Sequence, residues 1–255
     1  MSFFGKAYNI SSFEELMNLA PVLEEQTYKS QLVLIKGLGA LEKDKLLEWS
    51  RRLNKKTTDM DKFISWDFGF VMELKEDLNP KNYLFSKEEV PYHWDGAFHE
   101  EAGVLIFNCI EGTAKNTGRT LFANTKKIIS NMGAGDINYL ETQLIEYKTK
   151  KLAHYGGRLE RSPLDRHPIT GEKVLRFGEE VKTSLNPVRR IINDERTREL
   201  INELEKELYK EENCYRHEWV AGDILLADNH SLLHGRESFA QSDNGERHIR
   251  RIQLR

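Results

Sequence analysis

Apolar positions along the chain fall mostly in short runs that predict β-strands. Runs of this kind, bounded by polar or glycine-containing segments, occupy residues 31–36, 63–74, 104–110, 120–123, 173–177, 217–221, 223–226 and 248–254. Helical spacing of apolar residues instead predicts helices over residues 12–19, 41–53, 132–152 and 195–212, the third interrupted near Gly133 and Gly135. The pattern therefore favours a mainly β core with helices attached to it.

The same pattern gives no reason to divide the chain. It contains no internal repeat, no low-complexity segment and no linker. A length of 255 residues fits one domain over residues 1–255, which can bury a substantial core without disulfides or a structural metal. The sequence leaves the oligomeric state open.

Composition excludes several classes of partner. Lys and Arg number 38 against 41 Asp and Glu, and the resulting net charge of −3 argues against a general nucleic-acid binder. No apolar run approaches the roughly 18 residues of a membrane span, so no membrane partner is expected. Cys109 and Cys214 are expected to be free thiols, and together with the lack of a signal-peptide core they favour a cytoplasmic protein.

Candidate chemistry begins at His93 and Asp95. Two residues apart on a strand, their side chains lie on one face, where both can bind the same metal ion. A second histidine from a distant strand would complete the two-histidine, one-carboxylate set of non-haem Fe(II) oxygenases. The spacing alone is weak, because roughly one match is expected by chance from this composition. Indeed His99 and Glu101 form a second match.

A longer motif near the carboxyl end of the chain decides between the two matches. It consists of Gly-Asp, an apolar strand, Asp-Asn, His-Gly-Arg and Arg-x-x-x-Arg, at Gly222, Asp223, Asp228, Asn229, His234, Gly235, Arg236, Arg247 and Arg251. This motif resembles the late signature of the taurine/2,4-D (TauD/TfdA-type) dioxygenase family of Fe(II)- and 2-oxoglutarate-dependent oxygenases. His99 has no role in that signature, whereas His93 and Asp95 lie upstream of it in the family's order.

Two further segments extend the resemblance. Residues 118–124 look like the family's Gly-x-Thr-x-x-x-Asn segment, and residues 167–171 look like its His-Pro-x-Thr-Gly hairpin. The resemblance covers about residues 90–255 and implies a double-stranded β-helix (jelly roll, cupin-like) with flanking helices, a mainly β member of the α+β class. It also implies an enzyme that uses Fe(II), 2-oxoglutarate as cosubstrate and O₂ to oxidise a small molecule.

The resemblance implies roles for individual residues. His93, Asp95 and His234 would bind Fe(II), while Thr120 and Arg247 would hold the far carboxylate of 2-oxoglutarate. Imidazole and carboxylate suit a ferrous ion, and a planar guanidinium matches a carboxylate. The last 20 residues hold five arginines, so the balanced whole-chain charge hides a local cationic segment. Taken alone, such a segment is more often a solvated basic edge strand.

The substrate is the least determined part of the prediction. Residues 91–98 and 118–125 look most like the branch of the family that acts on tyrosine-derived isonitriles, which implies oxidative decarboxylation or desaturation of an isonitrile. Tyr92 and Phe98 would then flank the iron and hold an aromatic ring, and Arg251 would bind a carboxylate. Two alternatives stay open: a hydroxylase of a free amino acid or a taurine-like sulfonate dioxygenase, and a catalytically inactive metal-binding jelly roll.

Overall fold

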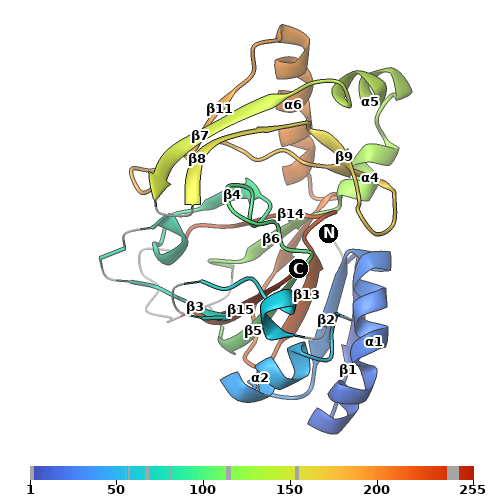
Figure 1. The fold of residues 1–255 in the computed structure, drawn as a ribbon, viewed down its shortest axis with the longest axis vertical. Helices are drawn as coiled ribbons and strands as arrows, with labels where there is room; N and C mark the ends of the chain where they lie inside the picture. The colour runs from blue at the N-terminus through green and yellow to red at the C-terminus, as the bar shows by residue number, and fades with distance from the viewer. Residues whose placement is uncertain are drawn as a thin grey trace.

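Two β-sheets face each other in the computed structural model of the protein (Figure 1). The structure describes residues 3–54, 56, 58–66, 69–77, 79–80, 82–112, 116–152, 155–239 and 247–255. Side chains from both sheets meet in one buried layer, where Leu105 and Phe107 of the first sheet lie with Phe122 of the second. The candidate site lies in this layer.

The first sheet has six strands and occupies the lower part of Figure 1. Its order is β1 (Lys6–Asn9), β2 (Leu32–Lys36), β13 (Ile224–Asp228), β5 (Val104–Glu111), β15 (His248–Leu254) and β3 (Val71–Lys75). Neighbouring strands are antiparallel, except that β1 and β2 are parallel. Helices α1 (Phe13–Ser30) and α2 (Lys43–Ser50) cover the outer face, where Leu23 and Trp49 share a buried cluster with Val33 and Ile106.

The second sheet has four antiparallel strands, in the order β12 (Cys214–His217), β6 (Thr120–Ala123), β14 (Leu233–Arg236) and β4 (Val90–His93). Its outer face packs against the upper part of the molecule in Figure 1. The elements there are α4 (Thr125–Ser130), α5 (Ala134–Leu140), β7 (Ile145–Leu152), β8 (Tyr155–Arg161), β9 (Leu164–Arg166), β10 (Lys173–Leu175), β11 (Arg189–Ile191) and α6 (Glu195–Tyr209). The remaining short elements are α3 (Asp59–Lys62) and the 3₁₀ helix η1 (Tyr83–Phe85).

Strand alternation decides which side chains reach the layer between the sheets. In β4, Tyr92 belongs to the outer cluster beside α6, so its neighbour His93 points inward. In β14, Leu233 belongs to the same outer cluster and His234 faces the interior. Arg251 of β15 faces the same interior from the opposite sheet.

The predicted mainly β architecture with flanking helices is confirmed, but one predicted helix is wrong in its second half. Residues 132–152 contain α5, after which the chain continues as the strand β7. The spacing of buried residues changes there: Ile145 and Tyr147 are buried, while Lys148 is exposed. That alternation by two is typical of a half-buried strand.

The strand predicted over residues 217–221 is also wrong. β12 ends at His217, and the chain turns before β13 begins. Within the turn, Asp223 N donates a hydrogen bond to the carbonyl oxygen of Val220 (2.9 Å). Gly222 has a φ of 94°, a left-handed backbone conformation that favours glycine. The apolar residues before Gly222 therefore belong to a turn.

The carboxyl-terminal arginines do not form a solvated edge strand. β15 lies between β5 and β3, which makes it an interior strand of the first sheet. Arg247 and Arg251 are buried, whereas Arg250 faces the other way and pairs with Glu73 at 3.1 Å. The cationic segment is therefore directed into the protein.

The two cysteines are buried and free, as the sequence predicts. Cys109 packs in the layer between the sheets, and Cys214 Sγ accepts a hydrogen bond from the hydroxyl of Tyr92 (3.1 Å). Of the helices formed by the described residues, none combines the length and the apolar character needed to cross a membrane.

Candidate metal centre and active site

Two strands of the second sheet bring the predicted metal ligands together. β4 and β14 pair with His93 opposite His234, and Asp95 follows two residues after His93. One potential ligand atom from each of these residues lies within 4.8 Å of the other two. Within the described part of the chain, this is the one cluster of three metal-binding side chains. Asp95 and His234 are buried and His93 is partly exposed, which leaves the cluster accessible from the side of His93.

Both imidazoles present a free lone pair to the centre of the cluster. His93 Nδ1 lies 2.9 Å from the carbonyl oxygen of Pro91 and so carries the proton, which leaves Nε2 available. Burial lowers the pKa of His234 to about 3, and the neighbouring His93 acts in the same direction. His234 is therefore a neutral imidazole at physiological pH, the form that binds a metal.

The two carboxylate oxygens of Asp95 have different contacts. Its Oδ2 forms an ion pair with Arg251 Nη1 (2.7 Å) and accepts a hydrogen bond from Gln253 Nε2 (2.9 Å). Its Oδ1 faces the imidazoles, 3.4 Å from His93 Nε2 and 3.8 Å from His234 Nε2. Burial by itself would raise the pKa of Asp95, but Arg251 and the two histidines hold it well below its usual range. Asp95 is thus an ionised ligand with one oxygen directed at the metal position.

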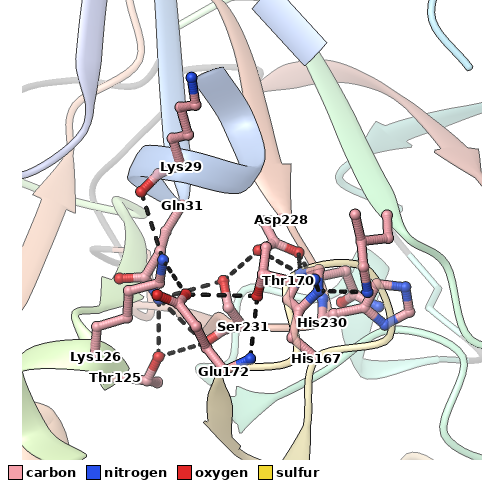
Figure 2. A network of polar contacts seen from close by, with 12 residues as sticks. Lys29, Gln31, Thr125, Lys126, His167, Thr170, Glu172, Asp228, His230 and Ser231 are labelled. Atoms are coloured by element: carbon pink, nitrogen blue, oxygen red, sulfur yellow. Dashed lines mark hydrogen bonds and ion pairs between the residues drawn. The ribbon is translucent and has the colours of Figure 1, made fainter. Parts of the chain in front are cut away.

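The backbone of Asp95 is held by Asn229, a residue of the Asp-Asn motif. Asn229 Oδ1 accepts from Asp95 N (2.9 Å), and its Nδ2 donates to the carbonyl oxygens of Asp95 (3.0 Å) and Ala102 (2.8 Å). The preceding Asp228 lies in the buried polar network of Figure 2, where His167 Nε2 donates to it at 3.0 Å. The Asp-Asn and His-Pro motifs therefore support the site and do not enter it.

Thr120 and Arg247 meet beside the metal cluster, in a cavity of about 40 Å³ that His234 also lines. Thr120 Oγ1 accepts hydrogen bonds from Trp219 Nε1 (2.8 Å) and from Arg247 Nη2 (3.3 Å). Two accepted hydrogen bonds occupy both lone pairs of the hydroxyl. Its own proton is then free to be donated to an anion in the cavity.

Arg247 is a buried cation for which the described part of the chain offers no carboxylate partner. Among the described residues it takes part in no ion pair, and its Nε has no hydrogen-bond partner. Burial lowers the pKa of Arg247 to about 9, with Arg236 acting in the same direction, so it is still charged at neutral pH. An unpaired buried charge is costly unless a ligand compensates it. This arrangement fits the distal carboxylate of 2-oxoglutarate.

A larger cavity of about 230 Å³ also adjoins the cluster. His93, Asp95, Arg251 and Phe98 are among the residues that line it. The aromatic residues that line it are Trp66, Tyr83, Phe85, Trp94, Phe98, Tyr147 and Tyr155. Arg251 lines both cavities and therefore lies between the two candidate binding sites.

The structure does not bring Tyr92 to this cavity, which corrects its predicted role. Tyr92 is fully buried in the outer cluster, where its ring packs against Tyr209 and its hydroxyl contacts Cys214. Alternation along β4 is the reason, because adjacent residues of a strand face opposite sides and His93 faces the metal. His99, the rival of His93, packs edge-on against Trp66 and is not part of the metal cluster.

Sequence reasoning missed two residues of the site. Gln253 holds Asp95, and its place two residues after Arg251 on β15 is a signal that could have found it. Glu179 lines the larger cavity, but it lies in an irregular segment after β10 and no local pattern marks it.

Comparison with known proteins agrees with this geometry. Residues 3–253 match the model of the family described as taurine catabolism dioxygenase TauD, TfdA family. The chain is 38% identical over 236 residues to 3-((Z)-2-isocyanoethenyl)-1H-indole synthase of Fischerella ambigua, covering 89% of this chain and 83% of the relative. It is 29% identical over 232 residues to tyrosine isonitrile desaturase of Pseudomonas aeruginosa, covering 88% and 77%.

A solved structure shows the same fold. PvcB from Pseudomonas aeruginosa superposes with a TM-score of 0.69 at 26% identity, over 92% of this chain and 79% of that one. A second solved structure is that of PvcB as an Fe, alpha-ketoglutarate dependent oxygenase from an isonitrile synthetic pathway. With the metal cluster and the buried arginine in place, this chain belongs to the taurine catabolism dioxygenase TauD, TfdA family and is an Fe(II)- and 2-oxoglutarate-dependent dioxygenase.

Proposed function

We propose that this dioxygenase oxidises an isonitrile derivative of an aromatic amino acid. The observation that carries the proposal is the larger cavity, which is lined by aromatic side chains together with His93 and Asp95. The names of the relatives support it, since one makes an indole that bears an isocyanoethenyl group and another desaturates tyrosine isonitrile. Tyrosine isonitrile and tryptophan isonitrile are therefore the two substrates of first choice.

The proposed reaction is an oxidative decarboxylation of the side chain. The substrate loses one hydrogen from the carbon next to the ring and its carboxylate as CO₂, and a carbon–carbon double bond forms between the two carbons. This oxidation releases two electrons from the substrate. Together with two protons they reduce one oxygen atom of O₂ to water, while the second oxygen atom enters succinate as 2-oxoglutarate loses CO₂. The bound ferrous ion supplies the activation of O₂.

The roles of the metal residues follow from their contacts. We propose that His93 Nε2, His234 Nε2 and Asp95 Oδ1 bind Fe(II), because these atoms face one another, while His93 Nδ1 and Asp95 Oδ2 are engaged by other groups. Arg251 and Gln253 position Asp95 by holding its second oxygen. Three protein ligands leave coordination sites open for the cosubstrate and O₂.

The cosubstrate is proposed to lie in the smaller cavity. Arg247 would pair with its distal carboxylate, and Thr120 would donate its hydroxyl proton to the same group. Phe98 and the other aromatic side chains would hold the substrate ring and exclude water. Arg251 Nε lacks a hydrogen-bond partner among the described residues, and it is proposed to contact the substrate carboxylate. The buried free thiols support a reducing, cytoplasmic setting.

Product analysis tests the proposal. The protein loaded anaerobically with Fe(II) and 2-oxoglutarate is exposed to O₂ with tyrosine isonitrile, tryptophan isonitrile, tyrosine or taurine. We expect succinate and a vinyl isonitrile of matching mass from at least one isonitrile. Stoichiometric succinate from taurine or tyrosine, with none dependent on either isonitrile, would overturn the substrate assignment.

The metal assignment is tested without substrate. The Fe(II)–2-oxoglutarate chelate should give a weak visible charge-transfer band under anaerobic conditions. His93→Ala should abolish this band, while His99→Ala, at the rival histidine, should keep it. A folded wild-type protein without the band would favour an inactive metal-binding jelly roll.

A further inference from the structure

A second carboxylate, Glu179, lines the larger cavity together with Asp95. Its backbone runs beside β4, where Glu179 N donates to the carbonyl oxygen of Tyr92 (2.9 Å). Glu179 is therefore fixed next to the strand that carries His93. No other acidic side chain among the described residues lines this cavity.

The two oxygens of Glu179 have different surroundings. Oε2 accepts hydrogen bonds from Tyr92 N (2.7 Å) and from the hydroxyl of Tyr209 (2.6 Å). Oε1 has no hydrogen-bond or ion-pair partner among the described residues, and Arg190, whose charge acts on Glu179, pairs with Glu205. Glu179 is thus anchored by one oxygen, and the other is left as an unused acceptor.

Burial raises the pKa of Glu179, although the hydrogen bonds from Tyr209 and Tyr92 act in the opposite direction. The carboxylate is partly removed from water at a cavity wall that is otherwise mostly aromatic. An apolar ring placed against Oε1 would complete its desolvation without replacing the lost hydrogen bonds. A ring that carries an O–H or N–H would replace one of them.

The tyrosine hydroxyls that line the cavity do not require a hydrogen-bond donor on the substrate ring. The hydroxyls of Tyr83 and Tyr155 can donate or accept, and Tyr147 already accepts a hydrogen bond from Gly178 N (3.1 Å). An ionised carboxylate can only accept. Glu179 is therefore the group that would distinguish a ring with a donor from one without.

We propose that Glu179 is a specificity-determining residue, whose Oε1 accepts a hydrogen bond from the ring O–H or N–H of the substrate. The inference rests on the proposed function and narrows its substrate class. It selects aromatic amino-acid isonitriles that carry a donor on the ring, such as a phenol or an indole, over isosteric rings that lack one.

The sharpest test uses Glu179→Gln. The position of Oε2 receives two hydrogen bonds and must hold an acceptor, so the amide oxygen of the glutamine takes that place. Its NH₂ group then faces the cavity, and an acceptor becomes a donor while the anchoring contacts remain. Tryptophan isonitrile is the matched probe because its indole N–H can only donate. Its benzothiophene isostere replaces that N–H by sulfur.

The measured quantity is the ratio of kcat/KM for the indole to kcat/KM for the benzothiophene isostere. We expect the wild-type ratio to exceed about 10, because a site built around a hydrogen bond rejects the analogue that lacks it. Glu179→Gln should bring the ratio to about 1 or below. Tyr209→Phe, which removes a partner of Oε2 and leaves Oε1 in place, should keep the wild-type ratio.

A purely structural Glu179 would give a different result. Both substrates would then lose activity by the same factor in Glu179→Gln, and an unchanged ratio would overturn the inference. A wild-type ratio near 1 would overturn it too, while leaving the proposed function standing. Failure of the wild type to oxidise any isonitrile would overturn the proposed function itself. The charge-transfer band of Glu179→Gln establishes that its metal site is assembled.

Discussion

Arg251 Nη1 lies 2.7 Å from Asp95 Oδ2, so the arginine next to both cavities is also the residue that orients the metal-binding carboxylate. The pair is buried, and each partner compensates the charge of the other. Because Arg251 holds Oδ2, the lone pairs of Oδ1 remain directed at the imidazoles. This relationship predicts that metal binding depends on Arg251 even before any substrate is present.

Arg251→Met should weaken Fe(II) binding by about 10- to 100-fold, the usual effect of losing a residue that orients a metal ligand. The measurement is an anaerobic Fe(II) titration followed by the charge-transfer band with saturating 2-oxoglutarate. Arg250→Met is the matched control, because Arg250 faces the other side of β15 and pairs with Glu73. Equal Fe(II) affinities for wild type and Arg251→Met would show that Asp95 is positioned by other contacts.

Arg247→Met should stabilise the protein without cosubstrate while destroying its affinity for 2-oxoglutarate. Arg247 is a buried charge without an ion-pair partner among the described residues, and replacing a poorly compensated buried charge by an apolar side chain is worth about 1–4 kcal/mol. Urea unfolding in the absence of ligand measures the gain in the free energy of unfolding. Added 2-oxoglutarate with Fe(II) should raise the Tm of the wild type and not that of the variant. Destabilisation of the ligand-free variant would contradict this account of Arg247.

Thr120→Val should raise the KM for 2-oxoglutarate by about 10-fold, since one hydrogen bond to a charged group is lost. Thr120→Ser keeps the hydroxyl and should stay close to the wild type. Trp219→Phe removes the indole N–H that occupies one lone pair of Thr120, which frees the hydroxyl to rotate. We therefore expect Trp219→Phe to raise the KM by a smaller factor and to have no further effect in the Thr120→Val background.

The parts of the fold that were predictable from sequence are those whose signal is local. The apolar runs over residues 104–110 and 248–254 became β5 and β15 because both strands are buried within a sheet. His93 and Asp95 could be paired because they are two residues apart on and beside one strand. In the turn before β13 and in β7, the local signal does not decide the structure, because an apolar run of that length suits strand, turn and helix alike.

The rest of the site depends on contacts that are distant in the sequence. Glu179 reaches the cavity because its backbone pairs with Tyr92, 87 positions earlier in the chain. Tyr92 adjoins His93 in the sequence, but its side chain does not face the metal. Strand alternation separates the two residues, so the face of a residue is decided by its register and not by its distance from a ligand.

His230 predicts a loss of stability in mild acid. Burial lowers the pKa of His230 to about 4 from its ordinary value of 6.5, and Arg176, which donates to its Nδ1 at 3.0 Å, acts in the same direction. Between pH 6.5 and 4 the unfolded chain binds a proton that the folded chain does not, so stability falls as the pH falls through this window. The loss between pH 7 and pH 5 amounts to about 2 kcal/mol.

His230→Asn keeps an acceptor for Arg176 but cannot titrate. In urea unfolding of the metal-free proteins, the wild type should therefore lose about 2 kcal/mol more than this variant between the two pH values, and parallel losses would rule out His230 as the cause.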